Sequence, residues 1–441
     1  MFDLDERLIS VVPSERQLKF QETEFYAFVH FTVNTFTDRE WGDGSESPEV
    51  FAPSRLDPEQ WCEAIASAGM KGLILTCKHH DGFCLWPSKY TSHSVAASPY
   101  KSGKGDVVRE VSDACRKYGL KFGVYLSPWD RHEPTYGAGR EYDDYFVSQL
   151  TELLTGYGDI FCVWFDGACG EGANGKKQYY DWDRYYSVIR ELQPGACINV
   201  CGPDIRWCGN EAGQTRPSEW SVLPKAMRDT EKVASKSQQS DSGEFRQRKL
   251  SAQELDLGSR EKLKDERELI WYPAEVNTSI RPGWFYHESE DGRVRPALEL
   301  FDIYLKSVGG NATFLLNIPP NREGLFHQND VAVLRDLGEL IRGVYTRSIT
   351  REATITPERL EITVDSSFPC GYLVLQEDIT KGQRVESFKV LADGEQIYEG
   401  TVIGYKRIVK LNGIKAKHIS IIITGARGEP VIKTAEVYAL Q

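Results

Sequence analysis

Short apolar segments that read as buried strands alternate with segments of helical periodicity over most of this chain. The clearest strand is the stretch Ile160–Gly167, in which six apolar residues run into one aspartate and a glycine. A short, continuous apolar run of this kind is typical of a strand buried on both faces of a parallel sheet. Strand–helix units joined by short connections fold with right-handed parallel crossovers. The alternation therefore restricts this part of the chain to an α/β architecture.

The predicted units follow one another closely up to about residue 200. Asp57 before Pro58, and Asp106 before an apolar stripe, have the positions of helix N-caps. Helices are expected after these two residues and over Glu141–Leu154 and Asp183–Leu192. Strands are expected over Tyr26–Val33, Gly72–Cys77, Lys121–Leu126, Ile160–Phe165 and Ala196–Val200.

The pattern weakens over residues 227–268, where Ser, Gln, Lys, Arg, Asp and Glu dominate. We interpret this stretch as a long polar segment that contains some helix. Beyond it, strands are predicted at Leu269–Val276, Trp284–Tyr286 and Thr313–Ile318, and helices at Leu298–Val308 and Asp330–Val344. Length and unit count favour a (β/α)8-like TIM barrel, irregular in its later half, over an open doubly wound sheet.

After about Thr346 the pattern changes to short alternating strands separated by glycine-containing turns such as 392–394. Such a pattern predicts a small antiparallel β-sandwich. We therefore expect a barrel domain at 1–346 and a sandwich domain at 347–441. The second domain shows no evident aromatic platform, so we favour a packing role over sugar binding. Its strands are predicted at Leu360–Val364, Tyr372–Leu375, Phe388–Leu391, Thr401–Ile403, Arg407–Leu411 and His418–Ile423.

Bulk properties exclude several classes of protein. The formal net charge is −12, which argues against nucleic acid or an anionic membrane as a partner. No apolar window is long enough for a membrane span. The N-terminus lacks a signal peptide's apolar core, so we expect a cytoplasmic protein, or a periplasmic or secreted one if a leader was trimmed. No feature of the sequence fixes an oligomeric state.

Polar and aromatic residues recur where the predicted strands end, and in a barrel all these ends face one mouth. Each has a structural alternative. His30 could be a core histidine, and Asp166 a helix N-cap or turn residue. His79-His80-Asp81 is a weak metal signal, because adjacent residues on a strand point to opposite faces. Their convergence favours a polar pocket. The residues are His30, His79, His80, Tyr125, Trp164, Asp166 and Arg206.

The motifs of several common reactions are missing from the chain. It holds no GxSxG elbow and no P-loop, the usual signatures of acyl transfer and phosphoryl transfer. A strand-end carboxylate beside histidines and tryptophans instead suits glycoside hydrolysis, which needs one protonated and one ionised carboxyl group.

A series of short motifs supports this interpretation. In this order they resemble the α-L-fucosidases of glycoside hydrolase family 29, over roughly residues 10–345. The hexapeptide at 78–83 and the tetrapeptide at 164–167 are highly specific together. The motifs are His30-Phe31, Asn34-Thr35-Phe36, Glu40-Trp41, Lys78-His79-His80-Asp81-Gly82-Phe83, Tyr125-Leu126-Ser127-Pro128, Val163-Trp164-Phe165-Asp166-Gly167, Gly309-Gly310-Asn311 and Leu315-Leu316-Asn317-Ile318.

The resemblance implies a retaining enzyme that acts on fucosylated glycans and needs no metal or organic cofactor. Asp166 matches the family's nucleophile. The acid/base position varies in the family, and we expect it at Glu211, with Glu219 and Glu275 as alternatives. Fucose-contacting positions correspond to His30, Glu40, Trp41, His79, His80, Tyr125 and Trp164, with Arg206 and Trp284 as further pocket candidates.

The neighbourhood of Glu211 resembles the subfamily that acts on α-1,3- and α-1,4-linked fucose in branched, Lewis-type glycans. Poor action on simple aryl fucosides would follow. Two rivals stay open at this point: a different retaining glycosidase on the same barrel, and a catalytically silent glycan-binding protein. A substrate panel would separate the first from a fucosidase, and loss of Asp166 or Glu211 would have favoured the second.

Overall fold

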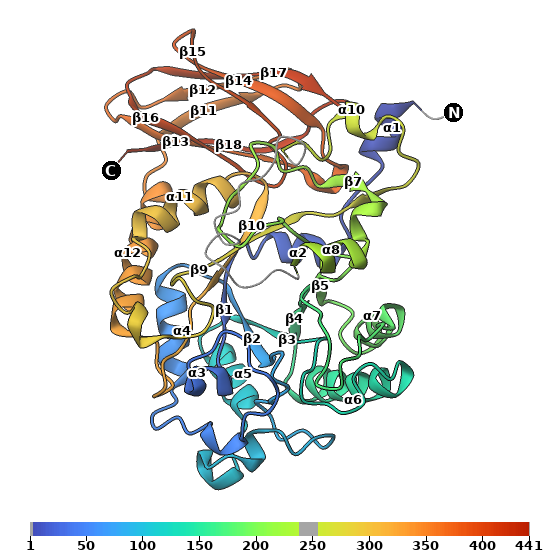
Figure 1. Ribbon diagram of the computed structural model, residues 1–441. Helices are drawn as coiled ribbons and strands as arrows, with labels where there is room; N and C mark the ends of the chain where they lie inside the picture. Colours follow the sequence, from blue (N-terminus) through green and yellow to red (C-terminus); the bar gives the residue numbers. More distant parts are fainter. Residues whose placement is uncertain (1–2, 238–254, 441) are drawn as a thin grey trace.

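The computed structural model describes residues 3–237 and 255–440. Eight parallel strands form a nearly closed ring with helices outside it, and antiparallel sheets built from the C-terminal residues lie at one end (Figure 1). The strand order is β5-β4-β3-β2-β1-β10-β9-β6. A single parallel bridge between Asn199 and Ile205 links the two ends of this order. The predicted (β/α)8-like barrel with a C-terminal antiparallel β-structure is confirmed.

The barrel strands are buried on both faces, as their apolar composition predicts. Every residue of β1, β2, β9 and β10 is buried. The strands are β1 (Phe25–Val29), β2 (Gly72–Lys78), β3 (Lys121–Leu126), β4 (Ile160–Phe165), β5 (Cys197–Val200), β6 (Arg206–Trp207), β9 (Ala274–Ser279) and β10 (Ala312–Asn317).

The outer helices begin where the sequence predicts. The Asp57 side chain accepts hydrogen bonds from the backbone of Glu59 and Gln60, and Asp106 accepts one from Arg109, so both are N-caps. Two N-terminal helices were not predicted, although Ser14 and Gln17 form a capping box. The helices are α1 (Leu4–Ile9), α2 (Glu15–Gln21), α3 (Val33–Thr37), α4 (Pro58–Ser67), α5 (Val107–Lys117), α6 (Arg140–Gly156), α7 (Trp182–Leu192), α11 (Ala297–Ser307) and α12 (Gln328–Tyr345).

Three strand predictions for the barrel are wrong in part. Val33 begins helix α3, because the Thr32 side chain accepts from the backbone of Asn34 and turns the chain. Leu269–Val276 is two strands: β8 (Leu269–Trp271) pairs antiparallel with β7 (Val222–Pro224), and β9 starts after Pro273. Residues 284–286 form no strand, and their backbone bonds to a side chain instead.

The polar stretch at 227–268 lies on the crossover between β6 and β9. Its described parts contain the helices α8 (Thr230–Ser237) and α10 (Arg260–Leu263), and 238–254 lie outside the described residues. No helix in the described ranges is long and apolar enough to cross a bilayer.

The C-terminal residues form a five-stranded sheet, β11-β12-β17-β14-β15, and a three-stranded sheet, β16-β13-β18. Alternate apolar residues such as Leu360, Phe388 and Val437 fill the core of these sheets. The first and last strands were not predicted. The predicted strand Thr401–Ile403 is wrong in part, because β15 ends at Thr401 and residues 402–403 form no strand. The division into domains at 346/347 stays a prediction. The strands are β11 (Thr350–Ile355), β12 (Arg359–Val364), β13 (Cys370–Glu377), β14 (Val385–Ala392), β15 (Glu395–Thr401), β16 (Arg407–Ile414), β17 (His418–Ala426) and β18 (Ile432–Ala439).

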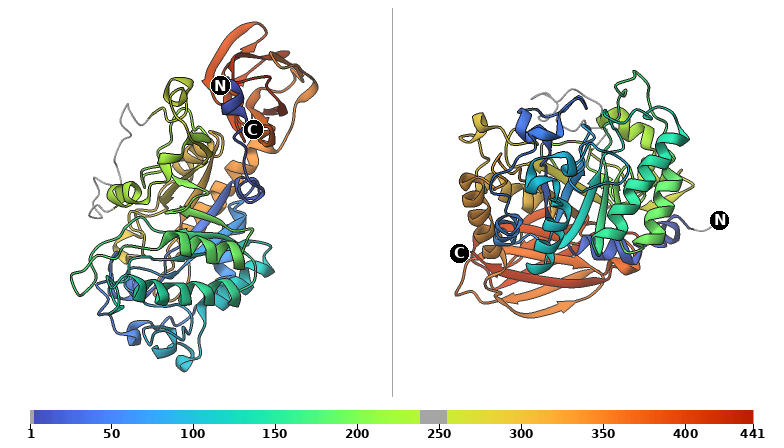
Figure 2. Two further views of the ribbon diagram at one scale, coloured as in Figure 1. Left: turned by 90° about the vertical axis from the view of Figure 1, so that its right-hand side faces the viewer. Right: turned by 90° about the horizontal axis from the view of Figure 1, so that it is seen from below.

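The segment Gly309-Gly310-Asn311 joins the two parts of the molecule. It lies between α11 and β10, and the Gly309 carbonyl accepts a hydrogen bond of 3.0 Å from the backbone of Ile408 in β16. A Cβ atom on Gly310 would lie 2.1 Å from the Lys306 carbonyl oxygen, so the backbone at position 310 can lie this close to that carbonyl only with glycine. Both views in Figure 2 show the C-terminal sheets against one end of the barrel.

Candidate active site

A cavity opens at the carboxyl ends of the barrel strands, and it encloses about 570 Å³ up to its open mouth. All the predicted site residues except Tyr125 and Arg206 line it. The lining residues are Phe28, His30, Glu40, Trp41, His79, His80, Trp164, Asp166, Ala168, Glu211, Ser237, Asn277 and Trp284.

Four lining residues were not predicted. Phe28 lies in β1, two positions before His30, which the sequence placed on the same predicted strand, so the period of two in a strand could have identified it. Asn277 was missed because the strand that carries it was drawn too short. Ala168 and Ser237 lie in loop and helix positions without a sequence signal.

Asp166 lies directly after β4, where the apolar run ends. Its Oδ2 accepts a hydrogen bond of 2.9 Å from the Tyr125 hydroxyl, and its Oδ1 accepts one of 2.9 Å from the backbone N–H of Ala168. Burial raises the pKa of Asp166, and these donors act against the rise. Tyr125 thus belongs to the site through its bond to Asp166.

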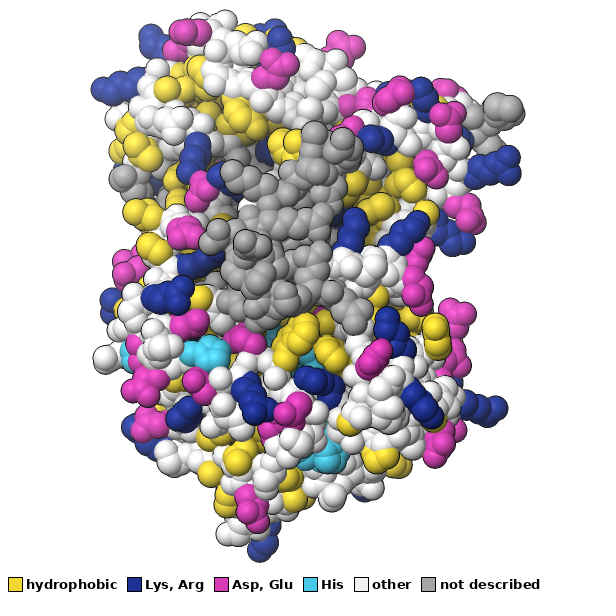
Figure 3. Space-filling view, in the orientation of Figure 1, with side chains coloured by type: hydrophobic (Ala, Val, Ile, Leu, Met, Phe, Trp, Pro, Cys, Tyr) yellow, Lys and Arg dark blue, Asp and Glu magenta, His cyan; other side chains and the backbone are white. Residues whose placement is uncertain are grey.

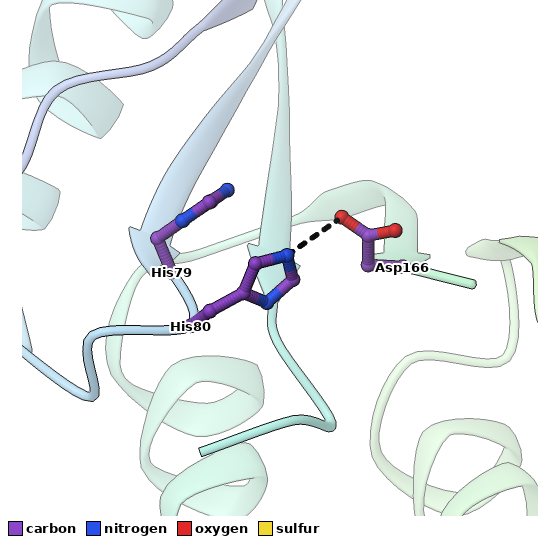
Figure 4. Close-up of side chains that lie close together, drawn as sticks. All are labelled: His79, His80 and Asp166. Atoms are coloured by element: carbon purple, nitrogen blue, oxygen red, sulfur yellow. Dashed lines mark ion pairs between the residues drawn. The ribbon is translucent and has the colours of Figure 1, made fainter. Parts of the chain in front are cut away.

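His79 and His80 both lie beside Asp166, which corrects the expectation that they face opposite ways (Figure 4). The reason is local: β2 ends at Lys78, so the alternation of a strand no longer applies to the two histidines. The Nε2 atom of His80 lies 3.7 Å from Oδ2 of Asp166. The ring of His79 stacks on that of Tyr125, with centroids 5.6 Å apart.

Neighbouring hydrogen bonds fix the tautomers of two histidines. The Ser127 hydroxyl donates its proton to the Trp129 carbonyl, so it can only accept from Nδ1 of His80, at 2.7 Å. The amide nitrogen of Asn317 donates to the Trp284 carbonyl, so its oxygen accepts from Nδ1 of His30, at 2.8 Å. In both neutral rings Nε2 is left as a hydrogen-bond acceptor.

Burial also keeps these rings uncharged. It lowers the pKa of His30 and of His80 to about 3, and it lowers the pKa of His79 well below its ordinary value. Nδ1 of His79 is buried and has no hydrogen-bond partner among the described residues. The site therefore presents neutral imidazole acceptors beside the Asp166 carboxylate, an arrangement that suits a ligand rich in hydroxyl groups.

The same three side chains also have the proximity of a metal site. One ligand atom each from His79, His80 and Asp166 lies within 4.8 Å of the other two, and this is the one such group of three or more found among the described residues. Each Asp166 oxygen already accepts one hydrogen bond, so a cation would share these oxygens with Tyr125 and with the backbone of Ala168.

Glu40 holds the loop that carries Trp284. Its carboxylate accepts from the backbone N–H groups of Trp284, at 2.8 Å, and Phe285, at 3.1 Å. It also contacts Nε2 of His287 at 2.7 Å, and Nδ1 of that ring lies 2.7 Å from Asp38. The hydrogen bond to Glu40 raises the pKa of His287 to about 9. His287 was not predicted, because nothing in the sequence connects it to residues 38–40.

The three glutamates considered as an acid lie in different environments. Glu211 lines the cavity and accepts a hydrogen bond of 3.1 Å from Nε1 of Trp284. Glu275 is fully buried in the barrel, where Tyr26, Trp164 and Asn199 donate to its two oxygens. Glu219 is also fully buried, away from the cavity lining.

Arg206 does not reach the cavity, contrary to the prediction. It is 3% exposed, and its guanidinium pairs with Glu219 thirteen positions further along the chain. Two buried opposite charges stabilise each other far better than either alone, which explains why the arginine points away from the mouth.

A second cavity adjoins the first and shares Asp166 with it. It encloses about 790 Å³ up to its mouth, between the loop after β4 and helix α8. Tyr179, Trp182, Lys177 and Glu231 line it. The Tyr179 side chain is 79% exposed, an unusual exposure for an aromatic ring without a partner surface.

The outer surface around the site has mixed charge. On the face drawn in Figure 3, the described Lys and Arg side chains are interspersed with Asp and Glu side chains. Those side chains form no broad positively charged patch.

Comparisons with known proteins agree on one family. The family model for alpha-L-fucosidase matches residues 12–343. The chain is 37% identical to alpha-L-fucosidase 1 of Arabidopsis thaliana, over 97% of this chain and 87% of that protein. It superposes on a candidate alpha-L-fucosidase of Bacteroides ovatus with a TM-score of 0.90 and 44% identity, over 100% of this chain and 76% of that one. It also resembles the GH29 fucosidase of Ruminococcus gnavus in complex with fucose, with a TM-score of 0.81 and 28% identity, over 98% of this chain and 95% of that one.

The contact between His287 and Glu40 predicts a pH-dependent stability. Since the pKa of His287 rises from 6.5 to about 9 on folding, its contribution is complete below pH 6.5 and is lost as the pH rises through 9. A His287→Gln variant should lie roughly 1–3 °C below the wild type in Tm at pH 6 and approach it above pH 9. Thermal melts of both proteins across this range measure the difference.

The exposed His418→Gln variant is the matched control. It should follow the wild type at every pH. A Tm difference for His287→Gln that stays constant from pH 6 to pH 10 would contradict the charged contact.

Proposed function

The chain belongs to the alpha-L-fucosidase family, glycoside hydrolase family 29, and we propose that it hydrolyses α-L-fucosides by a retaining, two-step reaction. In the first step the Asp166 carboxylate attacks the anomeric carbon, while Glu211 gives its proton to the departing glycosidic oxygen. In the second step Glu211 takes a proton from water, and the resulting hydroxide displaces Asp166 from the sugar. Fucose leaves with the configuration of the substrate, and both carboxyl groups return to their starting state.

The observation that carries this proposal is the pair of carboxyl groups lining one cavity from separate elements. Asp166 follows β4, and Glu211 lies on the loop after β6. The Tyr125 hydroxyl and the Ala168 N–H stabilise Asp166 as an anion, the form a nucleophile needs. Glu211 accepts a hydrogen bond from Trp284, another residue of the cavity lining, and in the proposed reaction it holds the proton that an acid needs.

The remaining lining residues suit a deoxy sugar. Nε2 of His30 and of His80 are acceptors for hydroxyl protons, since their Nδ1 atoms already donate elsewhere. The indole rings of Trp41, Trp164 and Trp284 offer apolar faces for the C–H groups and the methyl group of fucose.

We propose that the reaction needs no metal ion, so that His79 and His80 meet sugar hydroxyls, and Asp166 the anomeric carbon, rather than a cation. Fucose release after dialysis against EDTA should equal that of the untreated enzyme. Restoration of lost activity by a divalent ion, together with measured binding of that ion, would contradict this proposal.

Azide distinguishes the roles of the two carboxyl groups. In Asp166→Ala, azide can occupy the nucleophile's place and should give β-L-fucosyl azide. In Glu211→Ala, azide can attack the covalent intermediate and should give α-L-fucosyl azide. Both variants should lose hydrolysis by about 10²–10⁴-fold, and proton NMR of the azide product identifies the anomer.

The wild type with azide is the control and should release fucose only. The same azide anomer from both variants would overturn the assignment. Unchanged hydrolysis by Glu211→Ala would exclude it as the acid.

We propose further that the natural bond is an α-1,3 or α-1,4 link in a branched, Lewis-type glycan. The second cavity supports this, because it begins at Asp166 and has room for a further sugar ring against Tyr179. An exposed aromatic ring at the edge of a polar cavity is suited to stacking on a pyranose.

A substrate panel tests this specificity. The wild type should release fucose from a Lewis-type trisaccharide faster than from α-1,2-fucosyllactose. Tyr179→Ala should lower kcat/KM for the trisaccharide by about tenfold, the loss of roughly 1.4 kcal/mol of stacking, and change that for an aryl fucoside less than about twofold.

Tyr90→Ala removes another exposed tyrosine, which is 51% exposed and lines neither cavity. It should match the wild type on every substrate. Equal rates on both linkages would contradict the specificity, and an unchanged trisaccharide rate in Tyr179→Ala would contradict the role of the second cavity.

A further inference from the structure

The loop at 208–221 connects the cavity to the C-terminal sheets. It follows β6, carries Glu211 into the cavity lining and ends at β7. Its first half is closed on itself: the buried Asn210 accepts from the backbone of Ala212 and Gln214, and Arg216 donates to the Cys208 carbonyl at 2.9 Å. Glu211 therefore lies on a rigid turn.

Glu219 ties this turn to the barrel. It pairs with Arg206 of β6 and, at 3.1 Å, with Arg216. Burial alone would raise the pKa of Glu219, but the two guanidinium groups lower it below its ordinary value. Breaking a fully buried ion cluster of this kind is costly, so Arg206, Arg216 and Glu219 keep the loop in one conformation.

The second half of the loop is bound by the C-terminal sheets. Gln383, which is fully buried, accepts a hydrogen bond of 2.8 Å from the backbone of Ser221. The Ser218 and Thr401 hydroxyls bond to each other. Arg407 of β16 donates at 3.4 Å to the Pro217 carbonyl and at 2.6 Å to that of Val402.

Asn311 connects the loop, the barrel and the C-terminal sheets. Its amide nitrogen donates to the Glu219 carbonyl at 2.6 Å, and its oxygen accepts from the backbone of Tyr405 at 2.7 Å. The loop, the barrel and the C-terminal sheets therefore share one hydrogen-bonded network.

We infer that the C-terminal β-sandwich positions the acid/base of the active site, with Gln383, Thr401 and Arg407 as positioning residues that act through the loop on Glu211. The inference rests on the proposed role of Glu211. A general acid must lie within hydrogen-bond reach of the oxygen it protonates, and a displacement of about 1 Å can cost as much as 100-fold in rate. Loosening the far half of the loop should impair proton donation before it impairs fucose binding.

The test compares two leaving groups by kcat/KM, which reports the first chemical step. A Lewis-type trisaccharide needs a proton on its leaving oxygen, whereas α-L-fucosyl fluoride does not. Thr401→Val and Gln383→Leu should each lower kcat/KM for the trisaccharide about tenfold and that for the fluoride less than about twofold. Thr401→Ser keeps the hydroxyl and should restore the trisaccharide rate.

Two controls make the outcome decisive. Thr424→Val changes an exposed threonine of β17 whose hydroxyl bonds to that of Ser387, and it should leave both rates unchanged. Glu211→Ala should lower the trisaccharide rate far more than the fluoride rate.

Each pattern of rates has one meaning. Glu211→Ala can lower the trisaccharide rate far more than the fluoride rate while Thr401→Val and Gln383→Leu lower both rates equally or lower neither rate. In that case the positioning role is overturned and the proposed function stands. If Glu211→Ala lowers both rates equally, Glu211 is not the general acid, and the positioning inference is contradicted as well.

Discussion

The parallel direction of the barrel strands is the constraint on which the site depends. Parallel strands in a ring all end at one mouth, so β1, β2, β3 and β4 deliver His30, the two histidines at 79 and 80, Tyr125 and Asp166 to one place. The floor below them is held by a buried carboxylate. Glu275 takes hydrogen bonds from Tyr26, Trp164 and Asn199, and a buried carboxylate is tolerable only with such partners. That network fixes the indole of Trp164 beneath the cavity.

Burial then sets the electrostatics of the mouth. The same desolvation that keeps His30 and His80 neutral raises the pKa of Asp166. Nearby hydrogen-bond donors offset the rise in the pKa of Asp166, while Nε2 of His30 and of His80 stays unprotonated. Charge is concentrated instead at the rim, where His287 bridges Asp38 and Glu40. In the proposed reaction the Asp166 anion, beside uncharged histidines, favours the developing positive charge at the anomeric carbon.

The sequence predicted those parts of the fold and the site that depend on local patterns. Apolar runs followed by a polar residue marked the strand ends, and aspartates before helices marked the caps. Interactions between residues distant in the sequence could not be predicted: Arg206 looked like a pocket residue because it follows a predicted strand, and its partner Glu219 lies on the loop after β6. His287 was missed for the same reason. The two histidines after β2 were assigned to opposite faces by the alternation of a strand, although they lie beyond both its predicted end at Cys77 and its observed end at Lys78.

The identity of the nucleophile tests the central claim most directly. Incubation with 2-deoxy-2-fluoro-L-fucosyl fluoride should form a glycosyl-enzyme that turns over slowly, because the fluorine at C2 destabilises both transition states. Digestion and tandem mass spectrometry then locate the label. The account predicts one fluorofucosyl group on Asp166 and none after Asp166→Ala. A label on another carboxylate would contradict the assignment of Asp166 as the nucleophile of a retaining fucosidase.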